Sequence, residues 1–228
     1  MPDLTLRTPR TEGELLARAR SIAGLTLAEV AKPLGRPVPK TLRRAKGWVG
    51  ELIEMYLGAS ASSLPEPDFQ AIGVELKTIP VGRKGRPRES TYVCTVPLTG
   101  NRGLRWEASL VRRKLARVLW VPIEADPAVP LPIRRIGSPI LWSPDAAEES
   151  ALRTDWEELM DMVRMGELEQ LTPQHGTYLQ IRPKAPNARA LRASIGETGI
   201  RTPTLPRGFY LRACFTSRLL SRHYTHAG

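Results

Sequence analysis

Three residues in the first half of the chain have side chains suited to hydrolysing a phosphodiester bond. Asp68 is followed after six residues by Glu75, and Lys77 comes two positions later. Hard divalent cations such as Mg2+ prefer carboxylate oxygens and usually keep waters and substrate phosphate oxygens as further ligands. A bound metal lowers the pKa of its water and stabilises the leaving oxygen, while a nearby ammonium orients the attacking water. We therefore expect a magnesium-dependent nuclease centre on these residues.

The local pattern places this centre at the start of a strand. Residues 72–79 alternate, so that Glu75 and Lys77 share one face and apolar residues the other. Asp68 lies in the Pro-rich loop before the strand, and a chain that doubles back there brings both carboxylates to one ion. The carbonyl of Leu76 is then a further oxygen ligand. Spacing by itself is weak support, because a Glu-x-Lys pair on a strand is usually solvated charge.

Two more charged residues are candidates on weaker grounds. Glu54 lies in an expected helix over residues 46–57 that is otherwise largely apolar, and a carboxylate buried without a partner is destabilising. The alternative is an exposed helical glutamate. Lys114 lies in the basic run 112–117, where it is either a solvated cation or a contact to phosphate or to the site.

Charge favours a polyanionic partner. Lys and Arg outnumber Asp and Glu by 34 to 23, which gives a net charge of +11. Neutralising phosphates releases condensed counterions, so nucleic acid is the first partner to consider. The charge is uneven: Glu197 is the only acid after His175, whereas residues 145–169 are strongly acidic. This pattern indicates one nucleic-acid face and one face turned elsewhere. An anionic membrane surface or simple solubility would also account for the charge.

Composition excludes several other classes. The 228 residues with 41% apolar content suit one sizeable globular domain, and no apolar run is long enough for a membrane helix or a signal peptide. Cys94 and Cys214 provide neither a disulfide framework nor a zinc pair, which suits a reducing cytoplasm. His223 and His226 have helical metal-binding spacing but lack matching Cys or acidic partners. GxSxG, P-loop and dinucleotide-binding glycine motifs are absent.

The predicted elements indicate an α/β or α+β domain with a mixed β-sheet flanked by helices. Capping signals at Thr11 with Glu14 and at Thr26 with Glu29 begin two helices, and Gly58 ends a third. Further helices are expected over residues 106–115, 145–165 and 188–195, and strands over 72–79, 90–96, 118–123 and 178–182. A hairpin between the strands at 72–79 and 90–96 is the simplest pairing.

Long blocks of sequence resemble the MutH family of DNA mismatch repair endonucleases. The resemblance runs from about Glu12 to Tyr224. Its blocks are KGWVGELIEMYLGASASSLPEPDFQAIGVELKTIP, LTGNRGLRWEASLVRRKLARVLWVPIE, RRIGSPILWSP, DWEELMDM, HGTYLQIRPKA and LPRGFYLR. It implies a restriction-endonuclease-like fold in which residues 1–228 form a single endonuclease domain, with N-terminal and C-terminal arms flanking a DNA cleft.

The resemblance also implies an activity and its partners. Members nick the unmethylated strand of hemimethylated GATC sites 5′ to the guanine, and ATP-bound MutL activates them after MutS finds a mismatch. We accordingly expect a cytoplasmic monomer without a membrane partner, which uses Mg2+ and binds Mn2+ or Ca2+ in its place. Asp68, Glu75 and Lys77 match the family's metal and catalytic residues, with Glu54 and Lys114 completing the site.

DNA-binding positions match as well. The family contacts DNA through the residues matching Lys46, Gly47, Tyr92, Arg182, Pro183, Lys184 and Tyr210. Arg and Lys suit guanine edges in the major groove. Tyr210 matches the aromatic that senses adenine methylation, and Tyr92 the position, often Phe, that wedges into the bases. For both tyrosines the alternative is an ordinary half-buried core aromatic.

Two alternatives to a mismatch repair nickase remain. One is a GATC-specific type II restriction endonuclease on the same fold. The other is a non-catalytic DNA-binding module, which would not need Asp68, Glu75 and Lys77.

Overall fold

The computed structural model describes residues 7–42, 45, 47–60, 65–172, 174–184, 192–195 and 201–224. The chain divides into two compact units. The first comprises Met1–Glu89 and Ala116–Ser143, and the second comprises Ser90–Leu115 and Pro144–His226. Lys46 lies outside the described residues. The predicted class, a mixture of helices with mixed and antiparallel sheets, is confirmed.

The sheet of the first unit has the order β1-β3-β4, from Glu75–Val81, Val118–Glu124 and Ile140–Trp142. β1 and β3 are parallel, in a register that runs from Glu75 opposite Val118 to Val81 opposite Glu124. β4 is antiparallel to β3. Every residue of β3 but the last is buried, as expected for a central strand covered on both faces.

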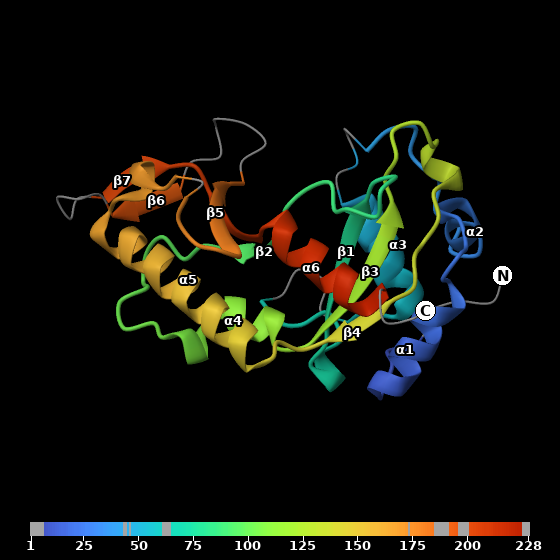
Figure 1. Cartoon of the computed structure of the whole chain (residues 1–228), viewed down its shortest axis with the longest axis horizontal. Coiled ribbons are helices and arrows are strands. Elements are labelled where there is room, and N and C mark those ends of the chain that lie inside the picture. Colours follow the sequence, from blue (N-terminus) through green and yellow to red (C-terminus); the bar gives the residue numbers. More distant parts are fainter. Residues whose placement is uncertain are drawn as a thin grey trace. The chain divides into compact units, whose positions relative to one another are not determined.

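Three helices, α1 (Glu12–Ser21), α2 (Leu27–Ala31) and α3 (Trp48–Leu57), pack in the first unit, and α3 lies against β1 (Figure 1). The predicted N-terminal caps at Thr11 and Thr26 and the predicted helix end at Gly58 are confirmed. The Thr11 hydroxyl accepts a hydrogen bond from the Glu14 amide, and the capping box at Thr26 is complete. Gly58 ends α3 with φ of 80°, a conformation that glycine adopts without steric penalty. The short 3-10 turns are η1 (Gln70–Ile72) and η3 (Leu131–Ile133).

The second unit contains an antiparallel sheet of order β2-β8-β5, from Thr91–Thr95, Arg207–Leu211 and Leu179–Pro183. β6 (Arg192–Ile195) and β7 (Arg201–Thr204) form a separate antiparallel pair. The helices and 3-10 turns of this unit are α4 (Leu110–Leu115), α5 (Ala146–Met165), α6 (Ala213–Tyr224), η2 (Trp106–Ala108) and η4 (Leu168–Gln170).

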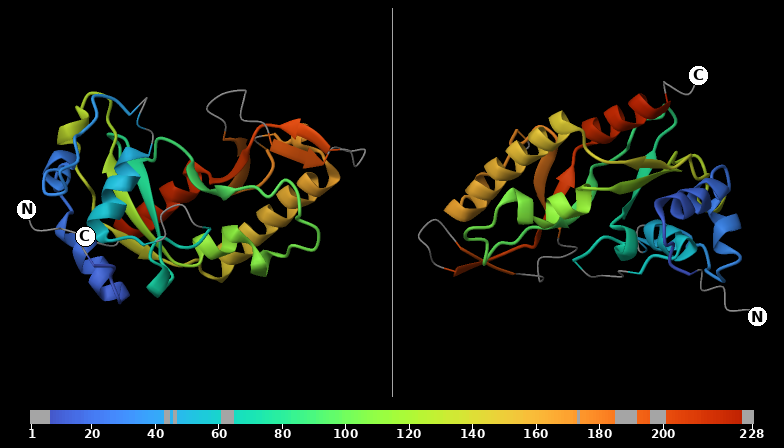
Figure 2. Two further views of the ribbon diagram at one scale, coloured as in Figure 1. Left: turned by 180° about the vertical axis from the view of Figure 1, so that it is seen from behind. Right: turned by 90° about the horizontal axis from the view of Figure 1, so that it is seen from below.

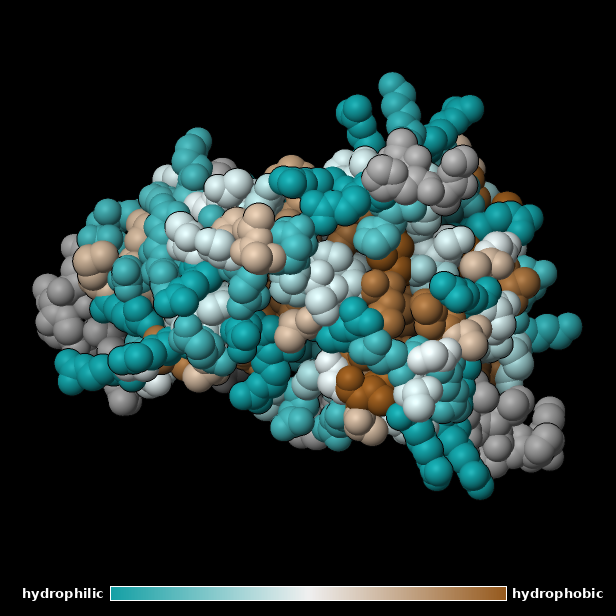
Figure 3. Space-filling view, turned by 60° about the horizontal axis from the view of Figure 1, so that its bottom comes forward, coloured by the Kyte–Doolittle hydropathy of each residue, from teal (hydrophilic) through white to brown (hydrophobic). Residues whose placement is uncertain are grey.

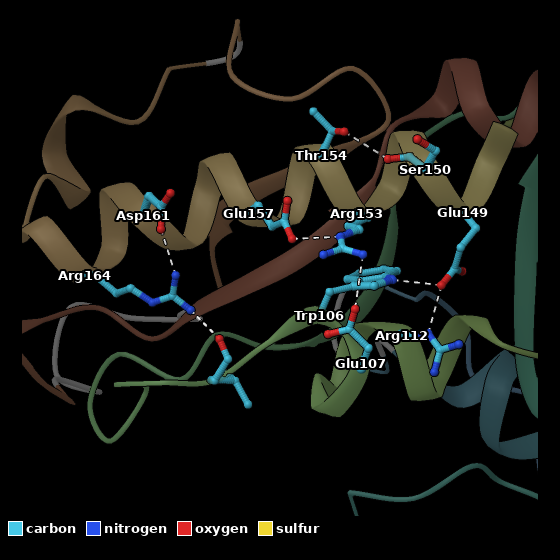
Figure 4. A network of polar contacts seen from close by, with 11 residues as sticks. Trp106, Glu107, Arg112, Glu149, Ser150, Arg153, Thr154, Glu157, Asp161 and Arg164 are labelled. Carbon is cyan, nitrogen blue, oxygen red and sulfur yellow. Dashed lines mark hydrogen bonds and ion pairs between the residues drawn. The ribbon is translucent and has the colours of Figure 1, made fainter. Parts of the chain in front are cut away.

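Helix α5 is the longest element of the second unit and runs beside η2 and α4 (Figures 1 and 2). Polar contacts attach it to that segment (Figure 4). Glu149 accepts hydrogen bonds of 2.8 Å from both Trp106 Nε1 and Arg112 Nε, and Arg164 donates to the carbonyl of Leu104. The predicted helix over 145–165 is confirmed, with a complete capping box at its start.

The predicted hairpin between residues 72–79 and 90–96 is wrong. The chain does turn back after β1, where the amide of Arg88 donates to the carbonyl of Pro80. The antiparallel contact then ends, because β1 pairs with β3 in the first unit and β2 pairs with β8 in the second. Pairing between distant segments therefore overrides the shortest connection.

Two predicted helices also need correction. The helix expected over 106–115 is interrupted at Ser109, whose ψ of 146° is extended, so that η2 and α4 are separate. In the region near 188–195, residues 192–195 form strand β6 rather than a helix, and 188–191 lie outside the described residues. The β-branched and aromatic residues that usually signal a strand are few in this segment.

The surface and the cysteines agree with the composition. On the face drawn in Figure 3, hydrophilic side chains predominate and apolar ones form small patches. Within the described ranges, no helix is long and apolar enough to span a bilayer. The two cysteines, both described, are not joined to each other: Cys94 is buried and Cys214 is exposed.

Candidate active site

A tight reversal of the chain sets Asp68 beside the start of β1. Phe69 and Val74 form an antiparallel bridge, and Gly73 turns the chain between them with φ of 65°. The Asp68 side chain then accepts a hydrogen bond of 2.8 Å from the Leu76 amide to Oδ2. Six intervening residues thus become a closed loop, as the doubling back of the chain predicts.

Glu75 and Lys77 form an ion pair on one face of β1. The distance from Lys77 Nζ to Glu75 Oε1 is 2.5 Å, and the side chains are 13% and 2% exposed. Residues two apart on a strand point to the same side, so the backbone itself brings these groups together. Burial of Glu75 is tolerable because its charge is partnered. The Glu75 amide donates to the carbonyl of Arg117, the residue just before β3, and this bond fixes the backbone at the start of β1.

Glu54, in helix α3, interacts electrostatically with Asp68, Glu75 and Lys77. We call these four residues the acidic cluster. Burial raises the pKa of Glu54 from 4.5 to about 7, aided by the negative charges of Asp68, Glu75 and Glu51, while Lys77 acts in the opposite direction. Glu54 is therefore partly buried and has charged neighbours, so the alternative of an exposed helical glutamate is wrong. The raised pKa therefore reflects the burial of Glu54 first, and the neighbouring carboxylates second.

This donor set fits a hard divalent cation. Asp68 and Glu75 offer carboxylate oxygens, which are the ligands that hard divalent cations prefer. Within the described part of the chain, no three His, Cys, Asp or Glu side chains gather closely enough to form a complete metal cage. Two carboxylates and the Leu76 carbonyl would leave positions for water and substrate, which is the coordination that Mg2+ favours.

Lys114 belongs to the second unit, whereas the acidic cluster belongs to the first. It lies in α4 and is 8% exposed. The alternative of a fully solvated cation is wrong for this residue. A role in the site remains a prediction.

Four of the residues expected to contact DNA gather on one face of the β2-β8-β5 sheet. Tyr92 is paired with Tyr210, and their rings meet edge to face with centroids 5.4 Å apart. Lys184 Nζ lies 4.0 Å from the Tyr92 ring centre and donates to its hydroxyl at 2.6 Å. The Arg182 guanidinium lies 5.8 Å from the Tyr210 ring centre. We call these four residues the aromatic-basic face.

The remaining expected DNA contacts have distinct positions. Pro183 is exposed at the end of β5, where strand alternation directs it away from the side shared by Arg182 and Lys184. Gly47 is the N-cap of α3 with φ of 112°, a conformation unfavourable for other residues. Gly47 therefore has a structural reason to be glycine, independent of any DNA contact.

Gly208 and Gln180 belong to this face and were not singled out from the sequence. A Cβ atom on Gly208 would lie 2.8 Å from Tyr92 Cε2 and 3.0 Å from Tyr210 Cε2. Gln180 is opposite Tyr210 and donates to Ser90 Oγ at 2.8 Å. Strand alternation from Arg182 and Tyr210 is the signal that finds both residues, but only once the pairing of β5 with β8 is known.

Glu54→Gln should make stability less dependent on pH. The folded protein keeps the Glu54 proton up to about pH 7, whereas the unfolded chain releases it near 4.5. The parent therefore loses stability as pH rises through this window. Urea denaturation in EDTA should show the variant gaining, relative to the parent, roughly 1 kcal/mol between pH 5 and pH 8, a value reduced for partial exposure of the side chain.

Glu51→Gln is the matched control, because Glu51 is one turn away and its side chain is 61% exposed. This control should keep most of the pH dependence of the parent, because Glu51 is the smallest of the causes that raise the pKa of Glu54. If the difference in free energy of unfolding between Glu54→Gln and the parent does not vary with pH, the raised pKa of Glu54 is contradicted.

Gly208→Ala should disturb the aromatic-basic face. The added methyl group must displace one of the two tyrosine rings, with an expected destabilisation of about 1–3 kcal/mol. Urea denaturation and near-ultraviolet circular dichroism measure the two effects. Gly82→Ala is the control, because its Cβ would meet mainly the flexible side chain of Arg88. Equal behaviour of the two variants would show that the rings do not need this space.

Comparison with known proteins gives a consistent family. The family model described as "MutH: DNA mismatch repair enzyme MutH" matches residues 57–155. A protein named DNA mismatch repair protein MutH from Escherichia coli O6:K15:H31 (strain 536 / UPEC) is 58% identical over 223 residues, which cover 98% of this chain and 97% of that protein. Proteins of the same name from Escherichia coli strains HS (O9:H4) and K12 are 57% identical with the same coverage.

Proposed function

The chain belongs to the MutH family of DNA mismatch repair enzymes, and on that premise we propose that it nicks the unmethylated strand of hemimethylated GATC sites 5′ to the guanine. It is a DNA endonuclease, a hydrolase, with the restriction-endonuclease-like fold of that family. The main support for the proposal is the hydrogen bond from the Leu76 amide to Asp68, which ties Asp68 to the strand that carries the Glu75–Lys77 pair.

The acidic cluster is the proposed catalytic centre. Asp68, Glu75 and the Leu76 carbonyl would hold Mg2+, with Mn2+ or Ca2+ able to bind in its place. Such a metal supplies a water of lowered pKa and stabilises the leaving oxygen. Lys77 orients the attacking water with its ammonium group, which the contact with Glu75 already fixes. Glu54 and Lys114 complete the proposed centre.

The aromatic-basic face is the proposed reader of the DNA site. Arg182 and Lys184 extend from the same side of β5 and suit the O6 and N7 acceptors of guanine. Tyr210 is proposed to sense the adenine methyl group, and Tyr92 to wedge against the bases. Pro183 is proposed to contact the DNA beside Arg182 and Lys184, and Lys46 and Gly47 to belong to a loop that approaches the DNA.

The proposed partners follow from the family. ATP-bound MutL would activate the enzyme, with MutS acting indirectly through recognition of the mismatch. We propose that the protein acts in the cytoplasm as a monomer, and that the chain as a whole is one endonuclease domain with arms on both sides of a DNA cleft. The positive charge of +11 supports a DNA partner.

Asp68→Asn and Glu75→Gln should each lower DNA cleavage by roughly 10³-fold, about 4 kcal/mol of transition-state stabilisation, because each removes a negative metal ligand. Binding to a GATC duplex in Ca2+ should remain within a few-fold of the parent. Nicking of a hemimethylated duplex with MutL and ATP provides the assay. Glu66→Gln, an exposed neighbour in the same loop, is the control. Full cleavage by either site variant would refute its role as a ligand.

Duplexes that differ only in adenine methylation test the proposed function against its alternatives. We expect nicking of one strand of the hemimethylated duplex, dependent on Mg2+ and stimulated by MutL with ATP. Strong double-strand cutting of unmethylated sites without MutL would instead identify a restriction endonuclease. Absence of cutting at every Mg2+ concentration would identify a DNA-binding module.

Tyr210→Ser should narrow the preference for hemimethylated over fully methylated sites, because the ring that would meet the methyl group is removed. Loss of one good apolar or edge contact corresponds to about 1–3 kcal/mol of discrimination, or roughly 5- to 150-fold. The ratio of the two nicking rates measures this preference. An unchanged ratio would place methyl recognition elsewhere.

A further inference from the structure

Helix α5 contains one aspartate whose surroundings differ from those of its other acids. Asp155 is 4% exposed, and its carboxylate accepts three main-chain hydrogen bonds. Oδ1 accepts from the amide of Thr177 at 2.7 Å. Oδ2 accepts from the amides of Tyr178 at 2.6 Å and Leu179 at 2.8 Å. Leu179 is the first residue of β5, so the carboxylate is hydrogen-bonded to the start of that strand.

The turn before β5 is shaped to meet this carboxylate. Gly176 has φ of 73°, and a Cβ atom there would lie 2.1 Å from the carbonyl oxygen of Leu179. Its amide donates to Glu158 Oε2 at 3.3 Å, one turn along α5 from Asp155. From the other side, Arg212 donates to the His175 carbonyl at 2.7 Å. The segment is therefore restrained on both sides of the glycine.

The carboxylate is better matched to this position than a neutral side chain. An ionised Asp has only acceptor sites, and here three donors converge on its two oxygens. Hydrogen bonds to a charged acceptor are shorter and stronger than neutral ones, and they offset the desolvation of a buried charge. An asparagine would replace one of the acceptor oxygens with a donor nitrogen that faces backbone N–H groups.

The hydrogen bonds to Asp155 fix the start of the strand that leads to Arg182 and Lys184, the basic residues of the aromatic-basic face. β5 pairs with β8 from Leu179 opposite Leu211 to Pro183 opposite Arg207. Strand alternation puts Arg182 and Lys184 on one side of the sheet, and a slip by a single residue would turn both to the other side. The side chains that we propose to read DNA thus depend on where β5 begins.

We propose that Asp155 is a positioning residue for DNA recognition, which sets the register of β5 and so directs Arg182 and Lys184 toward the base edges. This inference rests on the proposed DNA-reading role of those two residues. Helix α5 would then contribute to sequence specificity. Its negative charge alone would not indicate such a role, because acidic residues repel phosphate.

Other acids of α5 provide a contrast within the same helix. Glu157 pairs with Arg153 and Asp161 pairs with Arg164 in exposed ion pairs (Figure 4). Such pairs typically contribute little to stability. Glu157→Gln is therefore a matched control for Asp155→Asn: each replaces a carboxylate by its amide on α5, two residues apart.

The test compares binding to a hemimethylated GATC duplex with binding to a duplex of scrambled site, both in Ca2+. Asp155→Asn should lower the ratio of the two affinities by about 10-fold, as expected when one base contact is lost, with binding to the scrambled duplex within twofold of the parent. Glu157→Gln should leave the ratio unchanged. Amide hydrogen exchange should accelerate at residues 177–179 in Asp155→Asn and not in the control.

Lys184→Ala separates this inference from the proposed function. If Lys184→Ala lowers the ratio and Asp155→Asn does not, the positioning role of Asp155 is overturned while the DNA-reading role stands. If Lys184→Ala leaves the ratio unchanged, the reading role itself fails, and the inference fails with it. The double variant Asp155→Asn/Lys184→Ala should lose less than the sum of the two single losses, because both changes act in part through Lys184.

A second variant covers the case in which Asp155→Asn does not fold. Asp155→Glu keeps the charge but moves the carboxylate by one methylene, so the three hydrogen bonds cannot all be kept. It should lower the affinity ratio and accelerate exchange at residues 177–179 in the same way. A parent-like ratio in folded Asp155→Glu, together with accelerated exchange, would overturn the proposal.

Discussion

The hydrogen bond from the Leu76 amide to Asp68 is the constraint on which the acidic site depends. It brings a loop carboxylate to a strand that already has a carboxylate of its own, against their mutual repulsion. The amide dipole and the Lys77 ammonium oppose that repulsion, and the short bridge between Phe69 and Val74 makes the approach a property of the backbone. The pairing of β1 with the buried strand β3 and its packing against α3 then hold this arrangement in a rigid core.

Opposite charges are concentrated in different places of a chain that is strongly basic overall. In the first unit, Glu54 interacts with Asp68 and Glu75, and its pKa is raised by burial and, to a smaller extent, by their negative charges. The second unit presents Arg182 and Lys184 beside two tyrosine rings. A cation is favoured at the first location and phosphates or guanine edges at the second. A metal-dependent nuclease needs both, because its ion and its polyanionic substrate have opposite requirements.

The sequence predicted features that are encoded within a few residues. The caps at Thr26 and Gly58, the alternation of residues around Glu75 and the reversal after Asp68 are local, and the structure contains them. The partners of strands were not predictable in the same way, since β1 and β2 are close in sequence yet join different sheets. Gly208 matters through strand pairing and Asp155 through contacts with a distant segment, so neither had a local signal. The proposed DNA contacts were inferred from resemblance to relatives, and the sheet register explains why four of them lie together.

The aromatic-basic face couples its members physically. Lys184 donates a hydrogen bond to the Tyr92 hydroxyl, and Arg182 lies against the ring of Tyr210. The rings of Tyr92 and Tyr210 contact each other. The Tyr92 hydroxyl takes one of the three donors of the Lys184 ammonium and so orients the other two. A phenylalanine at position 92 would provide no such hydrogen bond. Displacement of the Tyr210 ring by an adenine methyl group would likewise move the surface against which Arg182 rests. With the roles proposed for these residues, recognition of the base sequence and recognition of methylation would be linked through ring contacts, for which Gly208 leaves room.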